Sequence, residues 1–227
     1  MSNVNQWQFN ELPNSRIIIT EEVYNRLMLL IGRSAWIASE HSSTLFGKKV
    51  GEGNTWVIDE VNCNEDYISR GQNSTNPSDY SISSGPNQTI EIQNKLNSVP
   101  GMVVIDIHTH PSGLIDNYRF FSSSDLSMFK EYNQIVSNKG GTFFAGLIGI
   151  DRVNGNMSFA IVWYDKSNDK FYRIQNIYLR RKLPNGEYND YQFEKYGNTQ
   201  LIMQTWGDQN SILDTHSEEE LENFRRR

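Results

Sequence analysis

Residues 102–113 read Met-Val-Val-Ile-Asp-Ile-His-Thr-His-Pro-Ser-Gly, a mostly apolar run that ends in two histidines and a proline. The apolar residues from Met102 to Ile107 predict a buried strand. Because side chains alternate along a strand, His108 and His110 should project to the same side of it. Pro111 interrupts ladder pairing directly after the second histidine, so the pair should lie at the rim of a sheet.

A carboxylate follows this strand at the start of a predicted helix over residues 122–136. Ser122 and Asp125 fit an N-cap and an acid in the first helical turn, which would fix both side chains in place. Together with His108 and His110, Asp125 would give three protein ligands and leave a fourth tetrahedral position open, the layout of a catalytic zinc site. The alternative for the same residues is a hydrogen-bonded pair of rim histidines beside an ordinary helix cap.

The remaining elements follow from hydrophobic periodicity and turn residues. Glycines and asparagines at residues 51–54 and 185–186 predict hairpin turns. The mixture of elements favours an α/β (α+β) fold. The pattern predicts further helices over residues 20–39 and 89–98, and further strands over residues 44–50, 55–63, 143–150, 157–164 and 171–179.

Composition limits the class of protein and its compartment. A chain of 227 residues that is 37% hydrophobic can bury a sizeable core. The net charge of −6 argues against a protein that holds nucleic acid mainly by neutralising phosphates. The single cysteine, Cys63, excludes an intrachain disulfide and fits a reducing cytoplasm. Without an apolar run of membrane-spanning length or a signal sequence, we expect a cytoplasmic protein that does not contact membranes.

The sequence pattern resembles that of a known enzyme family. His-x-His-Pro at residues 108–111, followed by Ser-x-x-Asp at residues 122–125, is similar to the JAMM (MPN-plus, or JAB-domain) zinc metallopeptidases of the prokaryotic deubiquitinase-like type. That family also carries Glu-x-Gly-Gly-x-Leu-x-Gly, and residues 40–47 here read Glu-His-Ser-Ser-Thr-Leu-Phe-Gly. Glu40 and the final glycine are in register, whereas serines replace the two middle glycines. The eleven residues 111–121 separate the second histidine from the serine, where the family usually has about seven.

The resemblance, which covers roughly residues 16 to 165, implies a fold and a division of the chain. The expected fold is MPN/JAB-like and cytidine-deaminase-like, with a mixed curved sheet flanked by helices and a C-terminal β-rich extension. Residues 1–15 would form a polar N-terminal segment, residues 16–197 the JAMM/MPN-like catalytic domain, and residues 198–227 a C-terminal extension. Residues 64–86, rich in Asn, Ser, Gly, Asp and Pro, would be an insertion that flanks the site.

The resemblance also implies the chemistry. Zn²⁺ bound by His108, His110 and Asp125 would lower the pKa of its water to about 7. Glu40 would act as the general base, and Ser122 would donate a hydrogen bond to the oxyanion. Family members typically cleave the amide bond after the Gly-Gly tail of ubiquitin or a ubiquitin-like protein. The expected partners are therefore a ubiquitin-like protein or its conjugate, and the activating and conjugating enzymes of the same pathway.

Other functions stay open on the sequence. His-x-His-Pro-Ser-Gly is also close to the sequence motif of RadC-like JAB proteins, whose activity is less clear. A non-catalytic MPN scaffold would bind partner proteins, although such scaffolds typically lose the metal ligands or the glutamate. A cysteine hydrolase would use Cys63, whose place in an apolar strand fits an inert thiol better. Asp106 is expected either to orient one histidine or to be an exposed rim acid.

Overall fold

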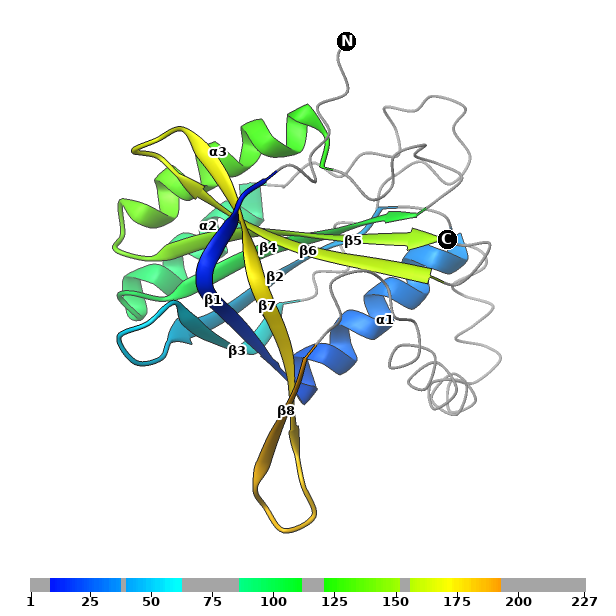
Figure 1. Cartoon of the computed structure of the whole chain (residues 1–227). Helices are drawn as coiled ribbons and strands as arrows, with labels where there is room; N and C mark the ends of the chain where they lie inside the picture. The colour runs from blue at the N-terminus through cyan, green and yellow to red at the C-terminus, as the bar shows by residue number, and fades with distance from the viewer. Residues whose placement is uncertain (1–8, 38–39, 63–85, 112–120, 152–155, 193–227) are drawn as a thin grey trace.

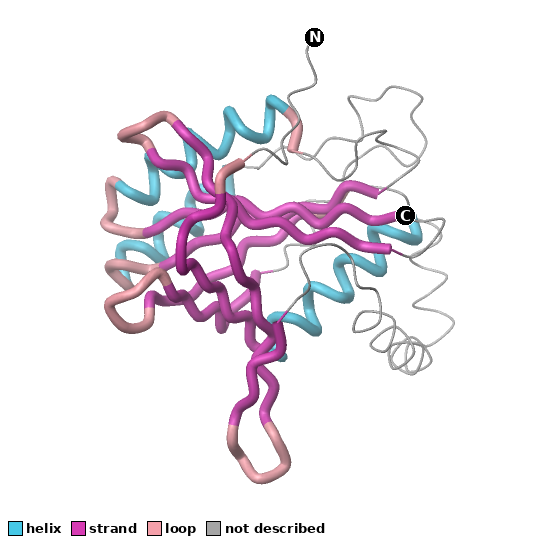
Figure 2. Tube along the Cα trace, in the orientation of Figure 1, coloured by secondary structure: helices cyan, strands magenta, loops and turns pink. Residues whose placement is uncertain are grey.

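The structure is a computed structural model that describes residues 9–37, 40–62, 86–111, 121–151 and 156–192 (Figure 1). Strands make up about half of this part of the chain and outweigh the helices, as Figure 2 shows. None of the helices in the described ranges is long and apolar enough to cross a membrane. The elements are β1 (Glu11–Thr20), α1 (Glu21–Ile37), β2 (Ser42–Lys49), β3 (Thr55–Asn62), α2 (Pro86–Ser98), β4 (Val103–Pro111), α3 (Ser123–Ser137), β5 (Thr142–Asp151), β6 (Asn156–Asp165), β7 (Lys170–Lys182) and β8 (Tyr188–Gln192).

The sheet closes into a barrel. Its strand order is β1-β3-β2-β4-β5-β6-β7-β8, and β1 also pairs with β7, so the first seven of these strands form a ring. Strand β1 runs parallel to both of its neighbours, β3 and β7. Strand β8 pairs with β7 in a hairpin that extends away from the ring (Figure 1).

The predicted fold class is therefore wrong. We expected an MPN/JAB-like, cytidine-deaminase-like α/β fold whose curved sheet is flanked by helices, and the described chain is instead a closed, mainly β barrel with three helices. The error originates in β1, because residues 11–16 are mostly polar and have no strand pattern. In the structure Ile17, Ile18 and Ile19 are all buried, as expected of a strand with parallel neighbours on both sides.

Two hydrophobic clusters lie on opposite faces of the sheet. The first contains residues from all seven ring strands together with one face of α1, so α1 packs against the inside of the curved sheet. The second joins α2 and α3 to the other face of β4, β5 and β6. Along β4, Ile105 and Ile107 belong to the α1 side, whereas Val104 belongs to the α3 side. Strand β4 therefore has α1 on one face and α2 and α3 on the other.

Several locally encoded elements are confirmed. Strands β2 and β3 form the hairpin predicted at residues 51–54. Helix α1 and strands β5, β6 and β7 are found where a helix and three strands were predicted, and these three strands pair antiparallel in chain order. Strand β4 continues four residues beyond the predicted Ile107 and thus carries both histidines. Strand β1 begins inside the segment 1–15 that was predicted to be a polar appendage. Residues 64–85 of the predicted insertion 64–86, and the predicted extension at 198–227, lie outside the described residues.

Candidate metal centre

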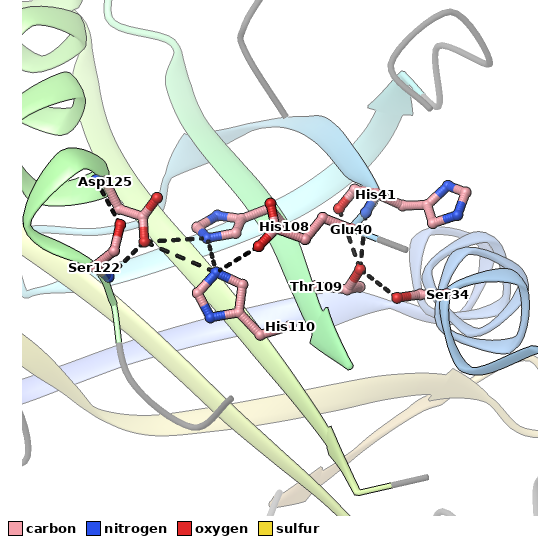
Figure 3. Close-up of polar contacts among 8 residues, drawn as sticks. All are labelled: Ser34, Glu40, His41, His108, Thr109, His110, Ser122 and Asp125. Carbon is pink, nitrogen blue, oxygen red and sulfur yellow. Dashed lines mark hydrogen bonds and ion pairs between the residues drawn. The ribbon is translucent and has the colours of Figure 1, made fainter. Parts of the chain in front are cut away.

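His108 and His110 lie near the end of β4, on the side of the sheet that faces α3 (Figure 3). Both are buried, with exposed fractions of 6% and 3%. Their Nε2 atoms are 3.1 Å apart, so the two imidazoles converge on one point. The alternation of side chains along the strand predicted this common side.

Asp125 reaches the same point from the first turn of α3. Its Oδ2 atom lies 3.6 Å from Nε2 of His108 and 3.8 Å from Nε2 of His110. Ser122 is the N-cap of α3, as predicted, and its Oγ accepts a hydrogen bond from the Asp125 N–H at 3.1 Å. In return the Ser122 N–H donates to Asp125 Oδ2 at 2.6 Å. This capping box therefore fixes the carboxylate oxygen that faces the histidines.

The three side chains could hold a metal ion. Their ligand atoms all lie within 4.8 Å of one another. A tetrahedral ion with ligand bonds of about 2.0–2.1 Å would separate neighbouring ligand atoms by about 3.3 Å. The observed separations of 3.1, 3.6 and 3.8 Å bracket that value closely, so little movement would be needed to close the group around an ion.

Glu40 lies beside this group, two residues before β2 begins. It is buried, with an exposed fraction of 9%, and its Oε1 atom is 3.5 Å from Nε2 of His110. Glu40 is therefore not a solvent-exposed acid. Gly47, the other matching residue of the motif, lies where a Cβ atom would come within 2.1 Å of the Val57 carbonyl oxygen. A side chain there would force β2 away from β3, which explains the glycine at that place.

The charges around His108 shift the pKa values of the centre. Burial by itself would lower the pKa of His108, but hydrogen bonding to Asp125 and the charges of Asp125, Glu40 and Asp106 raise it above the ordinary value. Burial would raise the pKa of Asp125. Hydrogen bonding to His108 and the charges of His108 and His110 have the larger effect and hold the pKa of Asp125 well below its usual range. Without an ion, the centre therefore favours a protonated histidine beside an ionised aspartate.

This arrangement predicts a pH dependence of the stability of the metal-free protein. A raised pKa in the folded state stabilises the fold fully below the unfolded value of about 6.5 and loses that effect as pH rises through the folded value. The free energy of unfolding in urea, measured with a chelator present, should therefore fall as the pH rises above about 6.5. Added metal should oppose the fall, because it binds the neutral imidazole. An unchanged pH slope in His108→Gln would contradict the assignment.

Sequence reasoning missed two buried hydroxyl groups near the centre. Ser42 lies opposite His108 in the β2–β4 ladder, is 5% exposed, and its Oγ has no hydrogen-bond partner among the described residues. Thr109 lies between the two histidines, faces α1, and donates to Ser34 Oγ at 2.7 Å (Figure 3). Serine in place of a motif glycine could have indicated Ser42, whereas Thr109 needed the packing of α1 on β4.

Two further expectations concern acidic and nucleophilic side chains. Asp106 is buried, with an exposed fraction of 3%, so the alternative of an exposed rim acid is wrong. Its role in orienting a histidine stays a prediction. Cys63, the residue of the cysteine-hydrolase alternative, lies outside the described residues. Comparison of the chain with protein-family models and with curated proteins finds no match.

Proposed function

We propose that the protein is a zinc-dependent peptidase or isopeptidase that hydrolyses the amide bond after the C-terminal tail of a ubiquitin-like protein. The observation that carries the proposal is the approach of the buried Glu40 carboxylate to the group formed by His108, His110 and Asp125. The support comes from this JAMM-like site and its sequence pattern. The closed barrel differs from the fold that we expected of this family, so the fold does not support the proposal.

The donor set fits zinc. Two imidazole nitrogens and one carboxylate oxygen are common zinc ligands, and three protein ligands leave one tetrahedral position for a reactant. When bound, zinc would supply a hydroxide nucleophile near neutral pH by lowering the pKa of water. The capping box holds Asp125 in place before an ion arrives, which reduces the reorganisation that binding requires.

Two residues would move protons and stabilise charge. Glu40 would take a proton from the attacking water and return it to the leaving amine, as a buried carboxylate near the ligands can do. The Ser122 hydroxyl accepts from the Asp125 N–H, and a hydroxyl that accepts can also donate. Ser122 would donate to the oxyanion that forms when the carbonyl is attacked.

The burial of the histidines favours a narrow substrate segment. With exposed fractions of 6% and 3%, His108 and His110 offer little room to a tail that carries bulky side chains. A tail that ends in two glycines has no bulky side chains there, so the carbonyl group of the bond to be cleaved could approach the histidines closely. The tail would not join the sheet beside β4, because β2 and β5 already pair with both edges of that strand. We propose that it enters at the C-terminal end of β4.

A chelation experiment with a defined probe tests this function. The probe is ubiquitin, or a ubiquitin-like protein, whose Gly-Gly tail is joined to a fluorogenic amine. We expect zinc-loaded protein to release the amine, a chelator to abolish release, and added zinc to restore it. A matched probe with valine in place of the last two glycines should react far more slowly. Absence of release from every diglycine probe, or release that survives zinc removal, would contradict the proposal.

A further inference from the structure

We propose that Thr109 is a positioning residue for Glu40, acting through the backbone at His41. This inference rests on the proposed function, in which Glu40 is the general base. Thr109 is 0% exposed and stands between the two histidines, so its side chain projects from the opposite face of β4. The Thr109 side chain therefore does not reach the candidate metal centre. It can affect the centre only through the backbone or through neighbouring residues.

The hydrogen bonds of Thr109 determine where the β2–β4 ladder ends. Ser42 pairs with His108, so the next antiparallel pair in register is His41 with Thr109. In a hydrogen-bonded antiparallel pair, the two residues normally exchange both N–H to carbonyl bonds. Here the Thr109 N–H donates to the His41 carbonyl at 2.9 Å, but the His41 N–H donates to Thr109 Oγ1, also at 2.9 Å. The hydroxyl thus replaces the backbone carbonyl as the acceptor.

The hydrogen bond from the His41 N–H to the Thr109 hydroxyl sets the path of the backbone at Glu40. Strand β2 begins at Ser42, so His41 lies just before the strand, and two hydrogen bonds join it to Thr109 of β4. Glu40 is the adjoining residue, and its carboxylate lies on the side of the histidines (Figure 3). The clamp formed by Thr109 and His41 is therefore one residue from the proposed base.

Helix α1 anchors the clamp. A threonine hydroxyl has one proton, and Thr109 Oγ1 lies 2.7 Å from Ser34 Oγ but 3.4 Å from the His41 carbonyl oxygen. The shorter contact makes Ser34 the acceptor. Ser34 is 0% exposed, so water would not readily replace either hydroxyl. A buried N–H that loses its acceptor is costly, and His41 would shift to find another one.

The experiment compares two substitutions at Thr109 and one at Ser34. Thr109→Val keeps the shape of the side chain but removes the hydroxyl, whereas Thr109→Ser keeps the hydroxyl. A displacement of about 1 Å in a catalytic group can cost about 10²-fold in rate. We expect Thr109→Val to lower kcat about 10- to 100-fold, with KM and zinc content within twofold of wild type. Thr109→Ser should retain most of the wild-type kcat. The loss of kcat in Ser34→Ala should be smaller than the loss in Thr109→Val.

A second readout is independent of catalysis. Hydrogen exchange at the His41 amide should accelerate in Thr109→Val and return toward the wild-type rate in Thr109→Ser. Wild-type kcat in Thr109→Val, or an unchanged His41 amide, would overturn the inference. So would an equal loss of activity in Thr109→Ser and Thr109→Val, since that would indicate a role in packing. If wild-type protein cleaves no probe while the His41 amide responds as expected, the proposed function fails and the clamp on residues 40–41 is supported.

Discussion

Glu40→Gln is expected to lower kcat by about 10²- to 10⁴-fold, the range that a general acid–base group typically contributes. Glutamine keeps the shape and burial of the side chain but cannot take a proton from water near neutral pH. Glu40 is not among the three grouped ligands, so zinc content and thermal stability should stay close to the wild-type values. Steady-state kinetics with the diglycine probe and elemental analysis of the same preparation measure the two effects separately.

A matched control comes from the same chain. Glu131 is an exposed acid on α3, and Glu131→Gln removes the same charge away from the candidate metal centre. Its kcat should match that of wild type. If Glu40→Gln cleaves as fast as Glu131→Gln, the assignment of the base through the register of Glu40 and Gly47 is wrong.

The second large effect concerns the metal. Wild-type protein should carry about one equivalent of zinc, and the double variant His108→Ala/His110→Ala should carry almost none. Removing both imidazoles leaves one carboxylate, Asp125, which is too few ligands for a zinc site. Elemental analysis after dialysis against a weak chelator measures the difference, and circular dichroism reports whether the barrel is retained.

His41→Gln is the control for this second prediction. His41 is also a buried histidine, but its ring lies apart from the three grouped side chains (Figure 3). The variant should keep its zinc, because glutamine leaves all three ligands present. Full zinc occupancy in the double variant, or equal loss in His41→Gln, would refute the assignment of His108 and His110 as ligands.

The site could be predicted from the sequence because its signals are local. Two histidines one residue apart need only the alternation of a strand to share a side, and Ser122 with Asp125 needs only the geometry of a helix start. The structure places them together, and it places Glu40, which the motif at residues 40–47 had already indicated, beside His110. The burial of Asp106 was not predictable in this way, because it depends on what packs against the middle of β4.

The closure of the barrel could not be predicted for a related reason. Closure depends on contacts such as that between Glu11 and Arg173, whose side chains form an ion pair at 2.8 Å across 162 residues of sequence. No periodicity within a short window encodes a partner at that separation. The polar residues of β1 that make these contacts also hide its strand character, so we expected a polar N-terminal segment at residues 1–15 and a mixed curved sheet flanked by helices.

The parallel pairing of β1 with β7 has a consequence for the order of folding events. Strand β1 is the first described element to be synthesised, yet one of its neighbours is complete only when Lys182 has been added. Until then the β1 edge that β7 later pairs with has unpaired N–H and carbonyl groups, which is the state in which a nascent chain aggregates or recruits a chaperone. Contacts of such long sequence separation also slow folding, because the entropy of loop closure is lost before they form. The ring is therefore completed late, and the interval before closure is the vulnerable period of this chain.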